Sequence, residues 1–241
     1  MKKNIINNLF ELWEHIGVNG QFLHSTAQYS YVKPGNCSWP NKVFRLKESE
    51  TDFKELYQHI ENGNIPDSIS IGEKKTLETQ LLAHNFKLKS VVKGMYLNLQ
   101  KKNKPTNDFV SNEKVDNEVK AMEFAKIASL SFGYEILSST IISLINSSQL
   151  KLFIGKHSGL YVSCGMVLLD QKGISGLHMI GTIPEYRGLG LGKVMTNKLL
   201  FESFENKSKQ VVLVASESGE RIYSKLGFVA QGSLKSYSIN K

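Results

Sequence analysis

GLHMIGTIPEYRGLGLGKVMTNKLL, residues 176–200, is the stretch that decides the fold of this chain. Its first part, residues 177–182, is short and apolar, as a strand would be. Pro184 ends that strand because proline has no N–H group to donate to a sheet. A glycine-rich turn then leads into a second apolar pattern with helical spacing, formed by Leu191, Val194, Met195 and Leu199. The stretch therefore predicts a strand, a glycine-rich turn and a helix.

The turn RGLGLG, residues 187–192, has the properties of an anion-binding loop. The first N–H groups of a helix have no partner within the helix, and the helix dipole favours negative charge there. Gly188, Gly190 and Gly192 carry no Cβ atom that would hold a phosphate away from the backbone, and Arg187 adds a permanent positive charge. The alternative interpretation is a helix that merely begins with flexible glycines.

The spacing of the turn excludes two well-known phosphate loops. A Walker A loop, G-x-x-x-x-G-K-[ST], is excluded because Val194 follows Gly192 and Lys193. The dinucleotide fingerprint, G-x-G-x-x-G, is excluded because Met195 stands where its third glycine is required.

The pattern that remains, R-x-x-G-x-G after a strand, resembles the pyrophosphate loop of the GNAT N-acetyltransferase superfamily, Q/R-x-x-G-x-G/A. The preceding TIPEYRG resembles the strand-end segment of that family, and ASESGERIYSKLGF, residues 215–228, resembles its last motif. Both motifs occur in the order of the family. The resemblance covers residues 118–241 and implies a mixed α/β fold of the GNAT acyl-CoA N-acyltransferase type for that half.

The resemblance implies acetyl-CoA as the cofactor, lying across the strand that precedes the loop. Backbone groups of Ile180 and Thr182 are expected to hold it there. Many members of the family have an asparagine near the last strand that contacts the cofactor. Ser216 stands at the matching position and departs from that pattern, which weakens this contact. The phosphates are expected to lie against Arg187, Gly188, Leu189, Gly190, Leu191 and Gly192.

Two residues are candidates for the chemistry. Tyr223 matches the tyrosine of the family that donates to the cofactor sulfur, and a phenol is protonated at pH 7. His178 is the candidate base for the acceptor amine, because some GNAT enzymes that acetylate aromatic amines carry a histidine there. Strand alternation predicts that Gly176, His178, Ile180 and Thr182 share the face that meets cofactor and substrate. The alternatives are a tyrosine and a histidine with structural roles only.

The composition limits the classes of protein to which the chain can belong. Its 241 residues, 41% of them hydrophobic, are enough for one large domain or two small ones. No stretch approaches the roughly 18 apolar residues of a membrane span, and residues 1–17 read as an amphipathic helix. Cys37 and Cys164 do not make a disulfide framework, and no Cys/His spacing predicts a metal site. We therefore expect a cytoplasmic protein.

The net charge of +8 fits a phosphate-bearing cofactor, but the lysines are scattered along the chain. No basic helix or patch interleaved with aromatic residues stands out, so the sequence does not favour a nucleic-acid partner.

The chain divides into an N-terminal α/β domain (residues 1–100), a polar linker (101–117) and the GNAT-like domain (118–241). Residues 81–97 can be laid on residues 223–239, since both read as a helix end, a phenylalanine and two strands. The N-terminal half is then either a degenerate second GNAT-like unit or a coincidental likeness. In the first case Leu81 replaces the tyrosine, no glycine-rich loop precedes it, and this half carries no cofactor site.

These observations predict an N-acetyltransferase that moves the acetyl group of acetyl-CoA to a primary amine of a small molecule or peptide. The alternative is a non-catalytic acyl-CoA-binding regulatory module. The presence of Tyr223 and His178 favours the enzyme. The sequence identifies neither the acceptor amine nor the oligomeric state.

Overall fold

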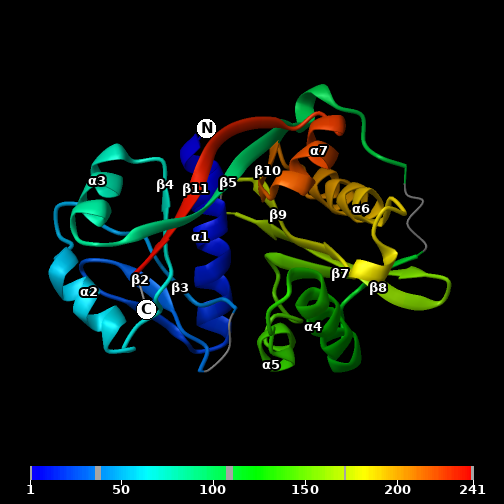
Figure 1. The fold of residues 1–241 in the computed structure, drawn as a ribbon. Helices are drawn as coiled ribbons and strands as arrows, with labels where there is room; N and C mark the ends of the chain where they lie inside the picture. Colours follow the sequence, from blue (N-terminus) through cyan, green and yellow to red (C-terminus); the bar gives the residue numbers. More distant parts are fainter. Residues whose placement is uncertain (1, 36–38, 107–110, 171, 240–241) are drawn as a thin grey trace.

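Eleven strands form one mixed sheet in the computed structural model, which describes residues 2–35, 39–106, 111–170 and 172–239 (Figure 1). Cys37 and residues 107–110 of the predicted linker lie outside the described residues. The elements of the N-terminal half are α1 (Lys2–Asn19), β1 (Leu23–Ser25), β2 (Ser30–Val32), β3 (Lys42–Phe44), α2 (Phe53–Glu61), β4 (Ile69–Gly72), α3 (Lys75–Ala83), β5 (Lys87–Asn98) and the short 3-10 helix η1 (Leu99–Lys101).

The C-terminal half contains β6 (Asn112–Lys114), α4 (Glu118–Phe132), α5 (Ser138–Ile142), β7 (Leu150–His157), β8 (Leu160–Leu169), β9 (Ile174–Thr182), η2 (Pro184–Tyr186), α6 (Leu191–Glu205), β10 (Gln210–Ala215), α7 (Glu217–Lys225) and β11 (Val229–Ser238). The strand, turn and helix predicted for residues 176–200 are thus confirmed. None of the described helices is both long and apolar enough to cross a membrane.

The two halves share the sheet by exchanging their last strands. The order is β1-β2-β3-β4-β11-β5-β10-β9-β8-β7-β6. The last strand of the chain, β11, lies between β4 and β5 of the N-terminal half, and β5 in turn lies between β11 and β10. The predicted linker, residues 101–117, therefore separates the halves along the chain but not in space. Its C-terminal bound is wrong, because Asn112–Lys114 is strand β6 and pairs with β7.

Helix α1 covers the middle of this shared sheet (Figure 1). Apolar residues at helical spacing form its buried face, in one cluster with residues from both halves of the chain. Among them are Ile5, Leu9, Leu12 and Ile16. Helices α2 and α3 pack against the N-terminal strands on the face of the sheet opposite α1. Helices α6 and α7 pack against the C-terminal strands on that same opposite face.

The structure supports the interpretation of the N-terminal half as a second GNAT-like unit. Both halves contain the order strand, helix, strand, helix, strand, as β3-α2-β4-α3-β5 and as β9-α6-β10-α7-β11. The ends of α3 and α7 match in detail. Phe86 N–H donates to the Leu81 carbonyl, and Phe228 N–H donates to the Tyr223 carbonyl, both at 3.0 Å. Leu81 therefore occupies the place of the tyrosine.

Two predictions of strand pairs are wrong. Residues 81–97 and residues 223–239 are each expected to end in two strands, but β5 is one continuous strand of 12 residues, and β11 is likewise a single strand. Gly94 makes a close approach and not a turn. A Cβ atom there would lie 3.0 Å from the Gln231 carbonyl oxygen and 3.1 Å from Ile5 of α1. The glycine at this position thus allows β11 and α1 to approach β5 closely.

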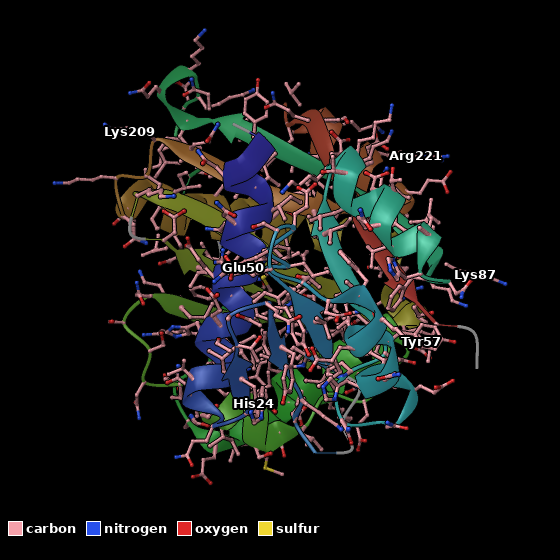
Figure 2. All side chains as sticks on the ribbon, turned by 90° about the vertical axis from the view of Figure 1, so that its left-hand side faces the viewer. His24, Glu50, Tyr57, Lys87, Lys209 and Arg221 are labelled. Carbon is pink, nitrogen blue, oxygen red and sulfur yellow. The ribbon has the colours of Figure 1, made fainter. Side chains whose placement is uncertain are left out.

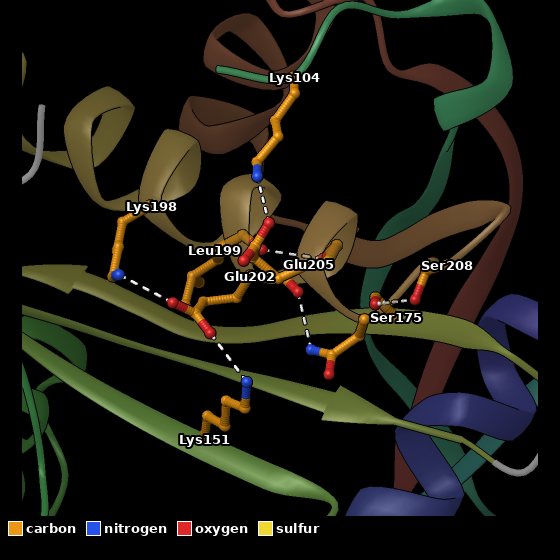
Figure 3. Close-up of polar contacts among 10 residues, drawn as sticks. Lys104, Lys151, Ser175, Lys198, Leu199, Glu202, Glu205 and Ser208 are labelled. Atoms are coloured by element: carbon orange, nitrogen blue, oxygen red, sulfur yellow. Dashed lines mark hydrogen bonds and ion pairs between the residues drawn. The ribbon is translucent and has the colours of Figure 1, made fainter. Parts of the chain in front are cut away.

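Helix α6 is fixed to the sheet by a partly buried ion-pair network (Figure 3). Glu202 accepts hydrogen bonds from Lys151 of β7 at 2.9 Å and from Lys198 of its own helix at 2.8 Å. Burial raises the pKa of the Glu202 carboxyl, but these two hydrogen bonds outweigh burial, and the pKa lies below its ordinary value. The helix that begins at the glycine-rich turn therefore has a fixed position over the strands.

Replacing Glu202 with glutamine is expected to lower the free energy of unfolding by about 1–3 kcal/mol, since two charge-assisted hydrogen bonds are weakened. Folding lowers the pKa of the Glu202 carboxyl below its ordinary value. The two hydrogen bonds therefore stabilise the protein fully above the ordinary pKa of glutamate, and this stabilisation is lost as the pH falls through the lower pKa of the folded protein. Urea denaturation at pH 7 and at pH 3 measures both effects. Glu205 lies on the same helix and pairs with Lys104 at the surface. Glu205→Gln is therefore the control, and it should lower the free energy of unfolding only slightly.

Candidate functional site

The candidate site lies where β9 and β10 part. These parallel strands are paired only from Ile174 to Gly176 on β9 and from Gln210 to Val212 on β10. Beyond this point β10 remains paired with β5 alone. The second half of β9 therefore borders a gap in the sheet. On the side of this gap its peptide groups have no partner strand.

A bulge in β9 accompanies the gap. Between the pairs Met166–His178 and Cys164–Gly181, two residues of β9 stand opposite one of β8. Met179, the first of the two, has a φ of 50°. After the bulge Ile183 N–H donates to the Val162 carbonyl of β8. Since peptide groups alternate along a strand, those of Thr182 point away from β8, into the gap.

The bulge overturns the prediction that Gly176, His178, Ile180 and Thr182 share one face. His178 lies under α1, where its Nε2 is 2.9 Å from the Asn8 Oδ1. Ile180 packs on the opposite face, in the cluster that contains α6 and α7. The extra residue in the strand reverses the alternation between positions 178 and 180.

The glycine-rich turn presents an open cradle at the start of α6. Gly188 and Gly190 have φ angles of 83° and 80°, which are left-handed and favour glycine. A Cβ atom at either position would meet nothing within 4 Å, and one at Gly192 would meet only Ile222, at 3.8 Å. Gly190 is the N-cap of α6, and no side chain caps this helix. The first N–H groups of α6 are therefore open to an anion.

Of the other loop residues, Arg187 makes protein contacts of its own. Its Nη2 donates to the Ser131 carbonyl at 2.8 Å, and its Nε donates to the Thr182 carbonyl at 3.3 Å. The guanidinium thus ties the loop to the end of α4 and keeps its charge beside the turn. Leu189 is 56% exposed, and Leu191 is the first residue of α6.

Ser216 follows β10 directly as the N-cap of α7, and Tyr223 lies within α7, on the far side of the gap. Tyr223 is 9% exposed, and its ring packs edge-on against Phe228 at 5.8 Å. Burial raises the pKa of its phenol to about 12, so the hydroxyl keeps its proton at neutral pH. Ser216 is the N-cap of α7, and its Oγ accepts from Gly219 N–H at 3.2 Å. That hydroxyl is therefore already used to start the helix.

His178 lacks the properties of a base that works near neutral pH. It is 6% exposed, and burial lowers the pKa of its imidazole to about 3. Titration of this group cannot produce an acid limb near pH 6.5, the value expected of an unperturbed histidine. Its partner Asn8 was missed in the sequence, because the two residues stand 170 positions apart and no local pattern connects them.

The buried imidazole should make stability depend on pH. Below about pH 6.5 the unfolded chain binds a proton at His178 that the folded chain does not bind, so the free energy of unfolding falls with the pH. Between pH 7.5 and pH 5 we expect a loss of about 2 kcal/mol from this residue. His178→Gln, which can still donate to Asn8, should remove that loss. Urea denaturation at both pH values tests it, and exposed His24→Gln should keep the wild-type slope.

Within the described residues, no group of three or more His, Cys, Asp or Glu side chains could hold a metal ion. The residues of the gap instead fit an acyl-CoA molecule. The open glycine turn and the uncapped start of α6 would hold its phosphates. Peptide groups of Ile180 and Thr182 on the gap side of β9 would hold its linear arm beside Arg187, which already donates to the Thr182 carbonyl. Tyr223 of α7 stands across the gap.

Comparisons with known proteins bear on the family and the fold. The family model described as "Acetyltransferase (GNAT) domain" matches residues 112–237. The uncharacterized N-acetyltransferase YitH of Bacillus subtilis (strain 168) is 35% identical over 107 residues, which are 44% of this chain and 30% of YitH. The match thus spans less than a third of that relative.

Solved structures extend the likeness in fold to both halves. A GCN5-related N-acetyltransferase from Kribbella flavida has a TM-score of 0.68 at 13% identity, over 91% of this chain and 89% of that one. A tandem GNAT protein from the clavulanic acid biosynthesis pathway has a TM-score of 0.56 at 9% identity, over 87% of this chain and 77% of that one. By its fold, its parted strands and the family model over residues 112–237, this chain belongs to the GNAT acetyltransferase family.

Proposed function

We propose that this protein is an acyltransferase that moves the acetyl group of acetyl-CoA to a primary amine of a small molecule or peptide. The observation that carries the proposal is the gap between β9 and β10, which opens beside the uncapped glycine start of α6. An extended ligand with a phosphate group at one end fits this arrangement.

The residues of this chain have separate roles in the proposed reaction. The N–H groups that follow Gly190 would hold the phosphates, and peptide groups of Ile180 and Thr182 would orient the arm. The bound cofactor would supply a thioester as the acetyl donor. Tyr223 keeps the proton on its hydroxyl and would donate to the sulfur that leaves. We assign removal of the amine proton to water rather than to the buried His178.

The N-terminal half is proposed to bind no cofactor. The helix that corresponds to α6 there is α2, and its first N–H groups are already occupied. The carboxylate of Asp52 accepts from Lys54 N–H at 2.9 Å and from Glu55 N–H at 3.1 Å. Glu48 and Glu50 precede it in the same connection, and Figure 2 shows Glu50 on this side of the molecule. Both carboxylates are paired with lysines, Glu48 with Lys74 and Glu50 with Lys47. The occupied N–H groups of Lys54 and Glu55, rather than charge repulsion, close this helix start to a phosphate.

We also propose a cytoplasmic location, in which the buried Cys164 remains a free thiol. The activity is tested by incubating the protein with acetyl-CoA and panels of alkyl, aryl, amino-sugar and peptide amines. Released thiol is measured with a chromogenic disulfide, and the acetylated product by mass spectrometry. Thiol release that depends on an amine, with matching product, is expected. Binding of acetyl-CoA without release for every class would identify a regulatory acyl-CoA-binding module instead.

A further inference from the structure

A cavity of about 500 Å³ lies in the N-terminal half, where the strands β3 and β4 part. These parallel strands pair only at Val43 and Ile69. Two residues after Val43, Arg45 has a left-handed φ of 54°, and β3 has already ended. The volume of the cavity lies in the range of small-molecule sites. The family model begins at residue 112 and assigns nothing to this half of the chain.

The cavity lies between two separate parts of the hydrophobic core. On one side of it are Ile6 and Phe10 of α1, which belong to the cluster under that helix. On the other side are Leu46, Ile71 and Leu77, which belong to the cluster under α2 and α3. All five side chains are at least nine-tenths buried, so the core behind them holds the wall in place. This wall favours apolar groups of a ligand.

The edge of β4 adds main-chain polar groups to the wall. Val43 N–H donates to the Ser68 carbonyl at 2.8 Å, so the peptide groups of Ser68 face β3. Because peptide groups alternate along a strand, those of Ser70 and Gly72 face the same way. Both residues line the cavity, beyond the one pair that joins β4 to β3. The Ser70 carbonyl and the Gly72 N–H therefore have no strand opposite them on this side.

The charged side chains that line the cavity already have partners. The pairs are Arg45 with Glu14, Lys74 with Glu48, and Glu73 with the Ser233 hydroxyl. A ligand with a charge of its own would have to break one of these pairs or leave its charge without a partner in an apolar space. The cavity therefore suits an uncharged molecule.

We propose that this cavity binds an extended, uncharged, peptide-like molecule in which two secondary amides flank an apolar side chain. The N–H and carbonyl groups of one extended residue point the same way. In the ligand, this N–H donates to the Ser70 carbonyl, and this carbonyl accepts from the Gly72 N–H. The ligand then repeats opposite Ile71 the pairing of Val43 with Ile69, in the place where β3 has ended. Its apolar side chain fills the space between α1 and α3.

This site is separate from the gap proposed for acyl-CoA. In the order of the sheet, β4, β11, β5 and β10 lie between the two places where strands part. Four strand spacings correspond to about 19 Å. Both ligands can therefore be bound at the same time, and the inference goes beyond the proposed acetyl transfer without depending on it.

Calorimetry with the full chain and a matched pair of probes tests the hydrogen bonds. N-acetyl-leucine butylamide has both amides, and its ester analogue has an oxygen in place of the leucine N–H. The amide should bind at one site per chain. The ester should bind at least about tenfold more weakly, because the Ser70 carbonyl loses its donor. Equal affinities of the two probes, or no binding of the amide, would overturn the inference.

A pair of variants at Asn7 locates the site. Asn7 of α1 lines the cavity and is half-buried, so a larger side chain there extends into the space. Asn7→Trp should weaken binding of the amide at least about tenfold, since it takes the room of the ligand. Asn7→Ala leaves the room open and should keep the affinity within about threefold of wild type. Wild-type affinity in Asn7→Trp would place the amide elsewhere and contradict the inference.

Acetyl-CoA separates this inference from the proposed function. The amide should bind equally well to the free protein, to protein saturated with acetyl-CoA and to Gly190→Glu, whose glutamate lies in the proposed phosphate site. Competition between the amide and acetyl-CoA would show that the amide occupies the gap, which overturns the inference and leaves the acetyltransferase standing. Binding of the amide as expected, in a protein that acetylates no amine, supports the inference and refutes the proposed function alone.

Discussion

Replacing Gly190 with glutamate is expected to abolish the binding of acetyl-CoA. Gly190 has a φ of 80° and forms the N-cap of α6 with no side chain over it. A glutamate there places a carboxylate where the phosphates are proposed to lie. At an effective dielectric constant of 20, two like charges about 4 Å apart repel by about 4 kcal/mol. Affinity should therefore fall by more than about 100-fold.

Titration calorimetry measures this change, and the wild type should bind one acetyl-CoA per chain because the described glycine loop occurs in one half. Gly63→Glu is the matched control. Gly63 also has a left-handed φ, 70°, and an empty surround, but it follows α2 in the other half. The Gly63→Glu substitution adds the same charge and a similar backbone strain as Gly190→Glu, and it should leave the affinity for acetyl-CoA unchanged. Wild-type affinity in Gly190→Glu would remove the loop from the cofactor site.

Replacing Tyr223 with phenylalanine should lower turnover by one or more orders of magnitude, the usual range for the loss of a general acid. The pKa of the phenol is raised to about 12 by burial, so the wild-type hydroxyl is protonated throughout the working pH range. Loss of the Tyr223 hydroxyl should therefore lower turnover by the same factor at every pH from 6 to 9. The affinity for acetyl-CoA should change little, because the ring remains packed against Phe228.

Steady-state rates with an amine from the screen, together with calorimetry, measure both quantities. Tyr29→Phe removes the hydroxyl of another buried tyrosine, in the separate core of the N-terminal half, and should leave turnover unchanged. Equal turnover of Tyr223→Phe and wild type would make Tyr223 a structural residue. The gap and the loop would then still define the acyl-CoA site.

Much of the fold could be predicted from the sequence because its signals are local. The glycines of residues 187–192 indicate a turn with left-handed backbone, and the structure has Gly188 and Gly190 there. The pattern formed by Leu191, Met195 and Leu199 predicts the helix that follows, and α6 begins at Leu191. The similarity of residues 81–97 and 223–239 leaves open a repeated unit or a coincidental likeness, and the matching hydrogen bonds at the two helix ends support the repeat.

The tertiary structure decided what depends on partners distant in the chain. The bulge at Met179 depends on the register of β9 against β8, and it reverses the faces of His178 and Ile180. Asn8 meets His178 only because α1 crosses the shared sheet. The exchange of β5 and β11 required that edge strands from both halves pair with each other, and neither strand carries a local signal for its neighbours. Sequence patterns record the conformation of a few consecutive residues, whereas register, strand order and the cavity between β3 and β4 arise from contacts that form only when the whole chain packs.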